Sequence, residues 1–197
     1  MFRVVQNRPS KVEDFVSEQL AGRPPFGHDA EAMELHRGVS VWETKAQAAL
    51  HARLFSLQTL FLVTLDDQSE HPLQSESTTS AAGHRTVTAP PIEIYSRSIR
   101  NETMPPTDDG GGELHWEVWS NATRNLVGSF PSEVEALTAL GEASRNNGTT
   151  YVRSLTVAMV AGSQVDAVTG PRLLRNLRKA RGQAVPVRTP SSRSQRR

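Results

Sequence analysis

The chain has 197 residues and no cysteine, so it can form neither a disulfide nor a thiolate metal site. It has no run near the roughly 18 consecutive apolar residues that a membrane-spanning helix needs. Its N-terminal stretch, MFRVVQNRPSKVEDF, also lacks the long apolar segment of a secretion signal. We therefore expect a soluble, cytoplasmic protein without a membrane partner.

Motifs that would identify an enzyme are missing as well. The six histidines show no paired spacing and no HExxH motif, so we expect no metal site. No serine lies in a GxSxG setting, and the glycines at 110–112 do not join a strand to a helix as in a dinucleotide loop. His84 and Thr86 form one HxT motif, whereas two-histidine phosphoesterases need two. A strand histidine beside a glycine turn is the simpler interpretation.

The composition favours two small domains over one large one. The hydrophobic fraction of 37% is adequate for modest cores only. The segment 101–112, NETMPPTDDGGG, combines proline, aspartate and three consecutive glycines without apolar periodicity, as linkers do. We predict an α+β protein with two small α/β modules, over residues 1–100 and 113–180, joined by a linker over 101–112. Residues 181–197 have the composition of a disordered basic tail.

The first module is organised around the stretch 36–65. Residues 39–42 alternate in the manner of a strand with one buried face. Thr44 can cap a helix over 45–55, and the apolar run 60–65 predicts a buried strand. A helical connection of this length favours parallel neighbours.

Two elements come before this stretch. Residues 2–5 are an apolar strand candidate. Ser10 and Glu13 match a capping box, and apolar spacing as far as Leu20 predicts a short helix after it.

The second module reads as a ββαββα arrangement. Its predicted elements are strands over 114–119 and 126–130, a helix over 133–147, strands over 151–160 and 164–168, and a helix over 170–179. Trp116 alternates with the buried face of the first strand and is expected in the core, whereas Trp119 is expected to be partly exposed.

The second module carries a recognisable pattern, aromatic-x-V-x-D-x-x-T-x-N-x-(V/L)-G-x-(Y/F), followed by an acidic-start helix and Gly-x-x-Y-V-x-S-L. Asn121 stands where the pattern has aspartate. The segment resembles a small bacterial module of unknown function. The matching positions are Trp119, Thr123, Asn125, Leu126, Gly128, Phe130, Glu133, Glu135, Ala136, Tyr151, Val152, Ser154 and Leu155.

The first module is similar to bacterial proteins of unknown function that share an RGVS-type strand, a Thr-x-x-x-Ala helix and a later Gly-His-x-Thr. Together the two resemblances cover most of the chain. They imply a two-module architecture and an intracellular bacterial setting, and they imply no known activity. The matching positions are Arg37, Gly38, Val39, Ser40, Thr44, Ala48, Gly83, His84 and Thr86.

The charge is strongly divided along the chain. From Arg172 onward there are nine basic residues and no acidic one, which leaves 13 basic and 21 acidic residues before that position. The body therefore carries about −8 and the end about +9. A basic end of this kind can bind nucleic acid, improve solubility or contact its own acidic body.

The candidate nucleic-acid residues lie at this basic end. Three of them, Arg172, Arg175 and Lys179, share one face of the predicted helix and can neutralise phosphates. No aromatic residue follows Tyr151, so no stacking platform accompanies the charges. The full candidate set is Arg172, Arg175, Arg178, Lys179 and Arg181.

An alternative interpretation is an ADP-ribosyltransferase-like enzyme or toxin built on the first module. Enzymes of that kind use a histidine or arginine before a glycine, a Ser-Thr-Ser strand and a late glutamate to bind NAD. Candidates for these roles are His36, Arg37, Ser77 in the run 77–80, and Glu93 or Glu113. Such an enzyme predicts a cleft where these groups converge.

The sequence thus favours a non-catalytic intracellular interaction or regulatory protein. Its partner is unknown: either a protein, or nucleic acid held by the basic end. In this interpretation the protein needs no cofactor.

Overall fold

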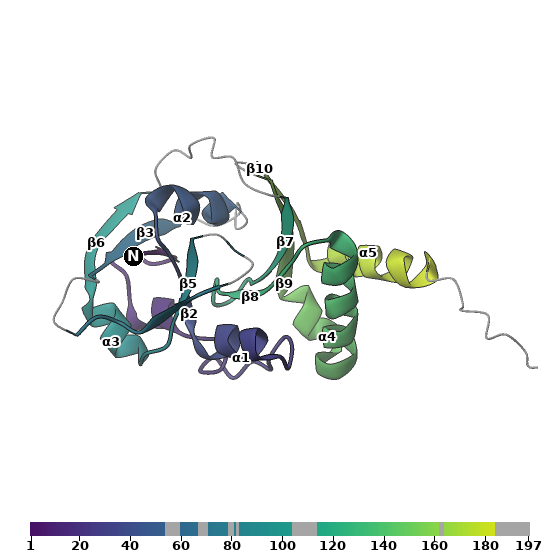
Figure 1. Cartoon of the computed structure of the whole chain (residues 1–197), viewed down its shortest axis with the longest axis horizontal. Coiled ribbons are helices and arrows are strands. Elements are labelled where there is room, and N and C mark those ends of the chain that lie inside the picture. Colours follow the sequence, from purple (N-terminus) through teal and green to yellow (C-terminus); the bar gives the residue numbers. More distant parts are fainter. Residues whose placement is uncertain are drawn as a thin grey trace, which may run out of the picture.

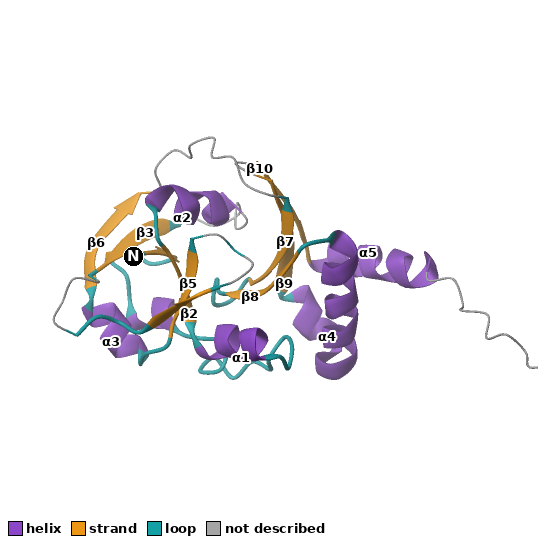
Figure 2. Cartoon of the chain, in the orientation of Figure 1, coloured by secondary structure: helices purple, strands orange, loops and turns teal. Residues whose placement is uncertain are grey.

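The computed structural model describes residues 1–53, 60–66, 71–78, 81, 83–103, 114–161 and 164–183. It confirms the α+β class, because helices pack against antiparallel sheets (Figure 2). One sheet has six strands from the first half of the chain, and the other has four strands from the second half. Among the described helices, none is long and apolar enough to cross a membrane.

The first sheet has the strand order β4-β5-β2-β1-β3-β6. Its strands and the helices between them are β1 (Phe2–Val5), η1 (Val12–Phe15), α1 (Ala30–Arg37), β2 (Val39–Trp42), α2 (Lys45–Ala52), β3 (Phe61–Leu65), β4 (Ser75–Ser77), β5 (His84–Val87), α3 (Pro91–Ser96) and β6 (Ser98–Thr103).

The predicted pairing of β2 with β3 is wrong. The N-terminal strand β1 lies between them and is antiparallel to both, so β2 and β3 run in the same direction without touching. Three of the four residues of β1 are buried. A strand that is covered on both faces is favoured at the centre of a sheet. Strand β1 therefore takes the position between β2 and β3.

The predicted helix from Ser10 to Leu20 is also wrong, because only the single 3-10 turn η1 forms. The backbone carbonyl of Asp14 accepts a hydrogen bond from Arg3 Nε at 2.8 Å, and Val16 is extended. The Asp14 carboxylate accepts the backbone N–H groups of Gln6 and Lys11 at 3.0 and 2.9 Å. A side chain that bonds nearby backbone N–H groups in this way stabilises a turn in competition with a helix, and the extended Val16 ends the helical geometry.

The second sheet has the order β10-β9-β7-β8 and confirms the ββαββα arrangement. Its elements are β7 (His115–Ser120), β8 (Leu126–Phe130), α4 (Glu133–Arg153), β9 (Leu155–Ala161), β10 (Gln164–Thr169) and α5 (Gly170–Gln183). Gly148 interrupts α4 with φ 81° and ψ 164°, but the chain then resumes helical geometry. Tyr151 therefore lies in the last turn of α4, and the predicted start of a strand at this residue is wrong.

Both faces of the second sheet are covered. In Figure 1, α4 and α5 lie on the side of the sheet away from the first module, where Val118, Val127 and Leu140 share a core. On the other side Trp119 packs in a core with Trp42 from the first sheet. The predicted exposures of the tryptophans are thus reversed, since Trp119 is 1% exposed and Trp116 is only half-buried.

The ends of the predicted linker and tail are ordinary secondary structure. Strand β6 continues to Thr103, so residues 101–103 belong to the first sheet, and residues 104–113 lie outside the described residues. Helix α5 continues to Gln183, so residues 181–183 of the predicted tail are helical, and residues 184–197 lie outside the described residues.

A buried arginine joins the two modules. The Arg3 guanidinium donates to the backbone carbonyls of Ser40 and Thr123 at 2.7 and 2.8 Å, and to Asn125 Oδ1 at 3.0 Å. The Asn125 side chain also accepts the Ser40 N–H at 3.1 Å and donates to the Val16 carbonyl at 3.0 Å. One asparagine on the second module therefore satisfies donors and acceptors from three segments of the first.

We predict that Asn125→Ala lowers the free energy of unfolding by about 2–4 kcal/mol, because it removes one acceptor of the buried Arg3 guanidinium and the side-chain partner of two backbone groups. Urea unfolding measures the change. The control is Asn146→Ala, because Asn146 is exposed and its loss should stay within about 0.5 kcal/mol. Equal effects of the two substitutions would contradict this role of Asn125.

Candidate functional site

Helix α5 presents the basic residues found in the sequence. Its apolar side is fixed to the second core through Leu173, Leu174 and Leu177, all of which are buried. Arg172, Arg175 and Lys179 are exposed and form no ion pair with a described residue. The helix, GPRLLRNLRKARGQ, contains no acidic residue. A leucine side thus anchors the helix, and a cationic side faces solvent.

The remaining two basic candidates, Arg178 and Arg181, also belong to α5. Their side chains lie outside the described part of the structure. In Figure 1 the helix projects from the second sheet on the side away from the first module.

The residues of the ADP-ribosyltransferase alternative lie on separate elements. His36 is in α1, where its Nε2 contacts the Arg23 carbonyl at 2.9 Å, and Arg37 is exposed at the end of the same helix. Ser77 is exposed on the edge strand β4, and Glu93 is exposed in the first turn of α3. These four residues share no hydrogen bond or ion pair in the described part of the chain. Residues 79, 80 and 113 lie outside it.

His84 has a structural environment, as the simpler interpretation expects. It is buried, its Nδ1 shares a hydrogen bond with the Thr78 hydroxyl, and its ring stands edge-on to Trp42 at 4.9 Å between centroids. Burial lowers the pKa of His84 to about 3, so the ring is neutral at pH 7. A neutral ring enclosed in this way does not hold a phosphate.

A group of ionisable side chains surrounds Glu117 of β7, which is 1% exposed. Its carboxylate accepts hydrogen bonds from His115 Nε2 and Trp119 Nε1, each at 2.9 Å. His51 Nε2, from α2, lies 2.9 Å from Glu117 Oε2. This group joins a helix of the first module to a strand of the second.

Both ring nitrogens of His51 face acceptors. Its Nδ1 lies 2.8 Å from the Gln47 carbonyl, which can only accept. Its Nε2 faces the carboxylate of Glu117, so the surroundings favour a ring that donates from both nitrogens. Trp42 stacks on it at 3.8 Å between centroids, where the indole face favours a cation.

Glu117 is correspondingly held as a carboxylate. Burial alone would raise its pKa, but the charge and hydrogen bonds of His51 and His115 hold the pKa below its usual range. A carboxylate stabilised so strongly is a weak base, so the geometry fits a structural ion pair better than acid–base catalysis.

Sequence reasoning missed this cluster. His115, Glu117 and Trp119 alternate along one side of β7, which is the pattern of a solvent-facing strand side. The signal that was available is the aromatic residue among these polar ones, because an exposed side rarely carries tryptophan. His51 is 66 residues away, and nothing in the sequence places it opposite Glu117.

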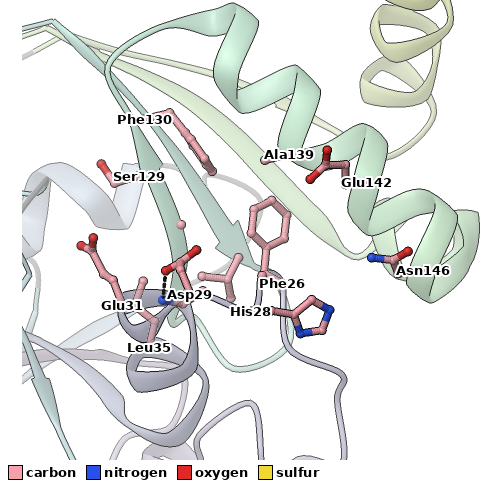
Figure 3. Close-up of a pocket in the computed structure, with 14 residues that line it drawn as sticks. Phe26, His28, Asp29, Glu31, Leu35, Ser129, Phe130, Ala139, Glu142 and Asn146 are labelled. Atoms are coloured by element: carbon pink, nitrogen blue, oxygen red, sulfur yellow. Dashed lines mark hydrogen bonds between the residues drawn. The ribbon is translucent and has the colours of Figure 1, made fainter.

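A pocket of about 420 Å³ lies where α1, β8 and α4 meet (Figure 3). Asp29 and Glu31 reach it from the start of α1, Phe130 from β8, and Glu142 from α4. The pocket therefore lies between the two modules, a common position for ligand sites.

No three His, Asp or Glu side chains among the described residues are arranged to hold a metal ion. Comparison of the chain with protein-family models, with curated proteins and with solved structures finds no match.

We predict that Glu117→Gln lowers the free energy of unfolding by about 2–4 kcal/mol, because the amide offers one acceptor oxygen where His51, His115 and Trp119 all face the carboxylate. Urea unfolding at pH 6 measures the loss. The matched control is Glu43→Gln, since Glu43 pairs with Arg85 at the surface and its loss should cost about 1 kcal/mol or less. A similar loss for both variants would show that Glu117 and His51 do not form a buried ion pair.

A second prediction concerns Glu18, which is buried beside Thr123 and lies 3.8 Å from Arg23. Burial raises the pKa of Glu18 from 4.5 to about 7. Between these values the folded chain binds a proton that the unfolded chain releases, so stability falls as pH rises. The wild type should therefore lose about 2–3 kcal/mol more than Glu18→Gln from pH 4.5 to 8.

Denaturant unfolding of both proteins across this range measures the difference between them. The opposing contribution of His84, whose pKa burial lowers, is common to both proteins and cancels. Parallel pH profiles would contradict the raised pKa of Glu18.

Proposed function

We propose that this chain is a non-catalytic interaction protein of the cytoplasm that binds nucleic acid through the basic side of α5. The observation that carries the proposal is the exposure of Arg172, Arg175 and Lys179 on a helix whose leucines are buried. Cations on an anchored helix can contact successive phosphates without first being ordered, so less conformational entropy is lost on binding.

The distribution of charge supports binding at this end. Nine basic residues and no acidic residue lie from Arg172 onward, whereas the preceding body carries about −8. A polyanion is attracted to α5 and repelled by the rest of the molecule. This polarity favours an encounter that begins at α5.

The chemistry of this surface favours contacts with the phosphate backbone. No aromatic residue follows Tyr151, so bases have no ring on which to stack. We therefore propose binding that depends little on base sequence and strongly on salt, as expected for a protein recruited to nucleic acid in a regulatory role.

The test is fluorescence anisotropy with a labelled duplex of about 20 base pairs over a range of salt concentrations. The full chain should bind, and its log affinity should fall linearly with log salt. The triple variant Arg172→Gln, Arg175→Gln, Lys179→Gln should bind more weakly. Its slope should be smaller by about 3, because each phosphate that is no longer neutralised lowers the slope by about 0.9.

A triple variant with the same change of net charge provides the control. Arg37, Arg100 and Arg153 are exposed cations outside α5, and their replacement by glutamine should leave the slope nearly unchanged. Equal losses of affinity in the two triple variants, or no binding by the full chain at low salt, would refute the proposal.

A further inference from the structure

The pocket between α1, β8 and α4 has an acidic lining. Of the 14 residues that line it, three carry carboxylates and none is lysine or arginine. Figure 3 shows Asp29 and Glu31 on one side of the pocket and Glu142 on the other. Among the described residues of the lining, only His28 has a side chain that can become cationic.

The local structure offsets only part of this negative charge. Asp29 caps α1 by accepting the Ala32 N–H at 2.9 Å, and the positive end of a helix amounts to about half a unit charge. Glu142 is 62% exposed and lies 3.7 Å from an equally exposed Arg145, a pair that water screens. Because the lining holds three carboxylates and no lysine or arginine, the pocket keeps a negative excess.

The inner surface is aromatic. Phe26 and Phe130 meet edge to face with ring centroids 6.1 Å apart, and Figure 3 shows both rings in the pocket. A Cβ atom at Gly128 would lie only 3.0 Å from the Phe130 ring and 3.1 Å from the Phe26 ring. The absence of a side chain at Gly128 lets both rings lie close over β8.

We propose that this pocket binds a small organic cation, a primary ammonium on a short apolar or aromatic stem. The stem would lie against Phe26 and Phe130, whose faces also attract cations. The ammonium group would be attracted by the carboxylates of Glu31 and Glu142, which Figure 3 shows on opposite sides of the pocket. This site is separate from the basic side of α5 and does not depend on the nucleic-acid proposal.

The test is an NMR titration of the full chain with 2-phenylethylammonium and, separately, with 3-phenylpropionate, which carries the opposite charge on the same aromatic group. The amine should bind with a dissociation constant on the order of 1 mM, shifting the amide signals of Gly128 and Asn146. The carboxylate probe should bind at least tenfold more weakly.

Variants distinguish a charge-dependent site from an apolar surface. Glu142→Gln and Glu31→Gln should each weaken binding of the amine by about threefold to tenfold. Gly128→Ala should also weaken it, because the new methyl group displaces the rings. The control on the same helix is Glu133→Gln, an exposed residue outside the pocket, which should leave the affinity unchanged.

Three results would overturn the proposal: equal binding of amine and carboxylate, shifts confined to residues away from the pocket, or no binding of the amine at about 10 mM. The α5 triple variant should bind the amine as the wild type does. This measurement on the triple variant distinguishes failure of the pocket proposal from failure of the nucleic-acid proposal.

Discussion

The hydrogen bonds of the buried Arg3 guanidinium, which reach both modules, are the constraint on which the arrangement of this molecule depends. A buried guanidinium must find an acceptor for nearly every N–H, and here the acceptors come from η1, β2 and the turn before β8. No single module supplies them all. The two sheets can therefore bury Arg3 only by packing against each other. Their relative position depends on the hydrogen bonds of this buried group as well as on the burial of apolar side chains.

The ion pair of Glu117 with His51 is a second polar contact between the modules, on the side where Trp42 and Trp119 share a core. These two polar contacts, separated by an apolar core, specify one orientation of the modules. If one module were rotated against the other, buried charges would be left unpaired. With that orientation fixed, α1 is held against β8 and α4, and the pocket has definite walls. Helix α5 is then presented on the far side of the second sheet.

Local patterns in the sequence were sufficient for the ββαββα order, the Thr44 cap and the basic side of α5, because each depends on neighbouring residues. Local patterns gave wrong predictions where contacts between residues far apart in the sequence determine the structure. Asp14 bonds Arg3 and the backbone of Gln6, and a single 3-10 turn replaces the helix expected after Ser10. Trp119 is buried because the first sheet covers a strand side that looks polar. The basic residues of α5 could be found from composition, whereas the pocket joins segments about 100 residues apart.

The central functional claim is that nucleic acid contacts α5 and leaves the acidic body free. Amide hydrogen exchange of the full chain, with and without a short DNA duplex at low salt, tests this most directly. The account predicts slower exchange over residues 170–183, with the strands of both sheets unchanged. Slower exchange confined to the first module, with α5 unaffected, would contradict it.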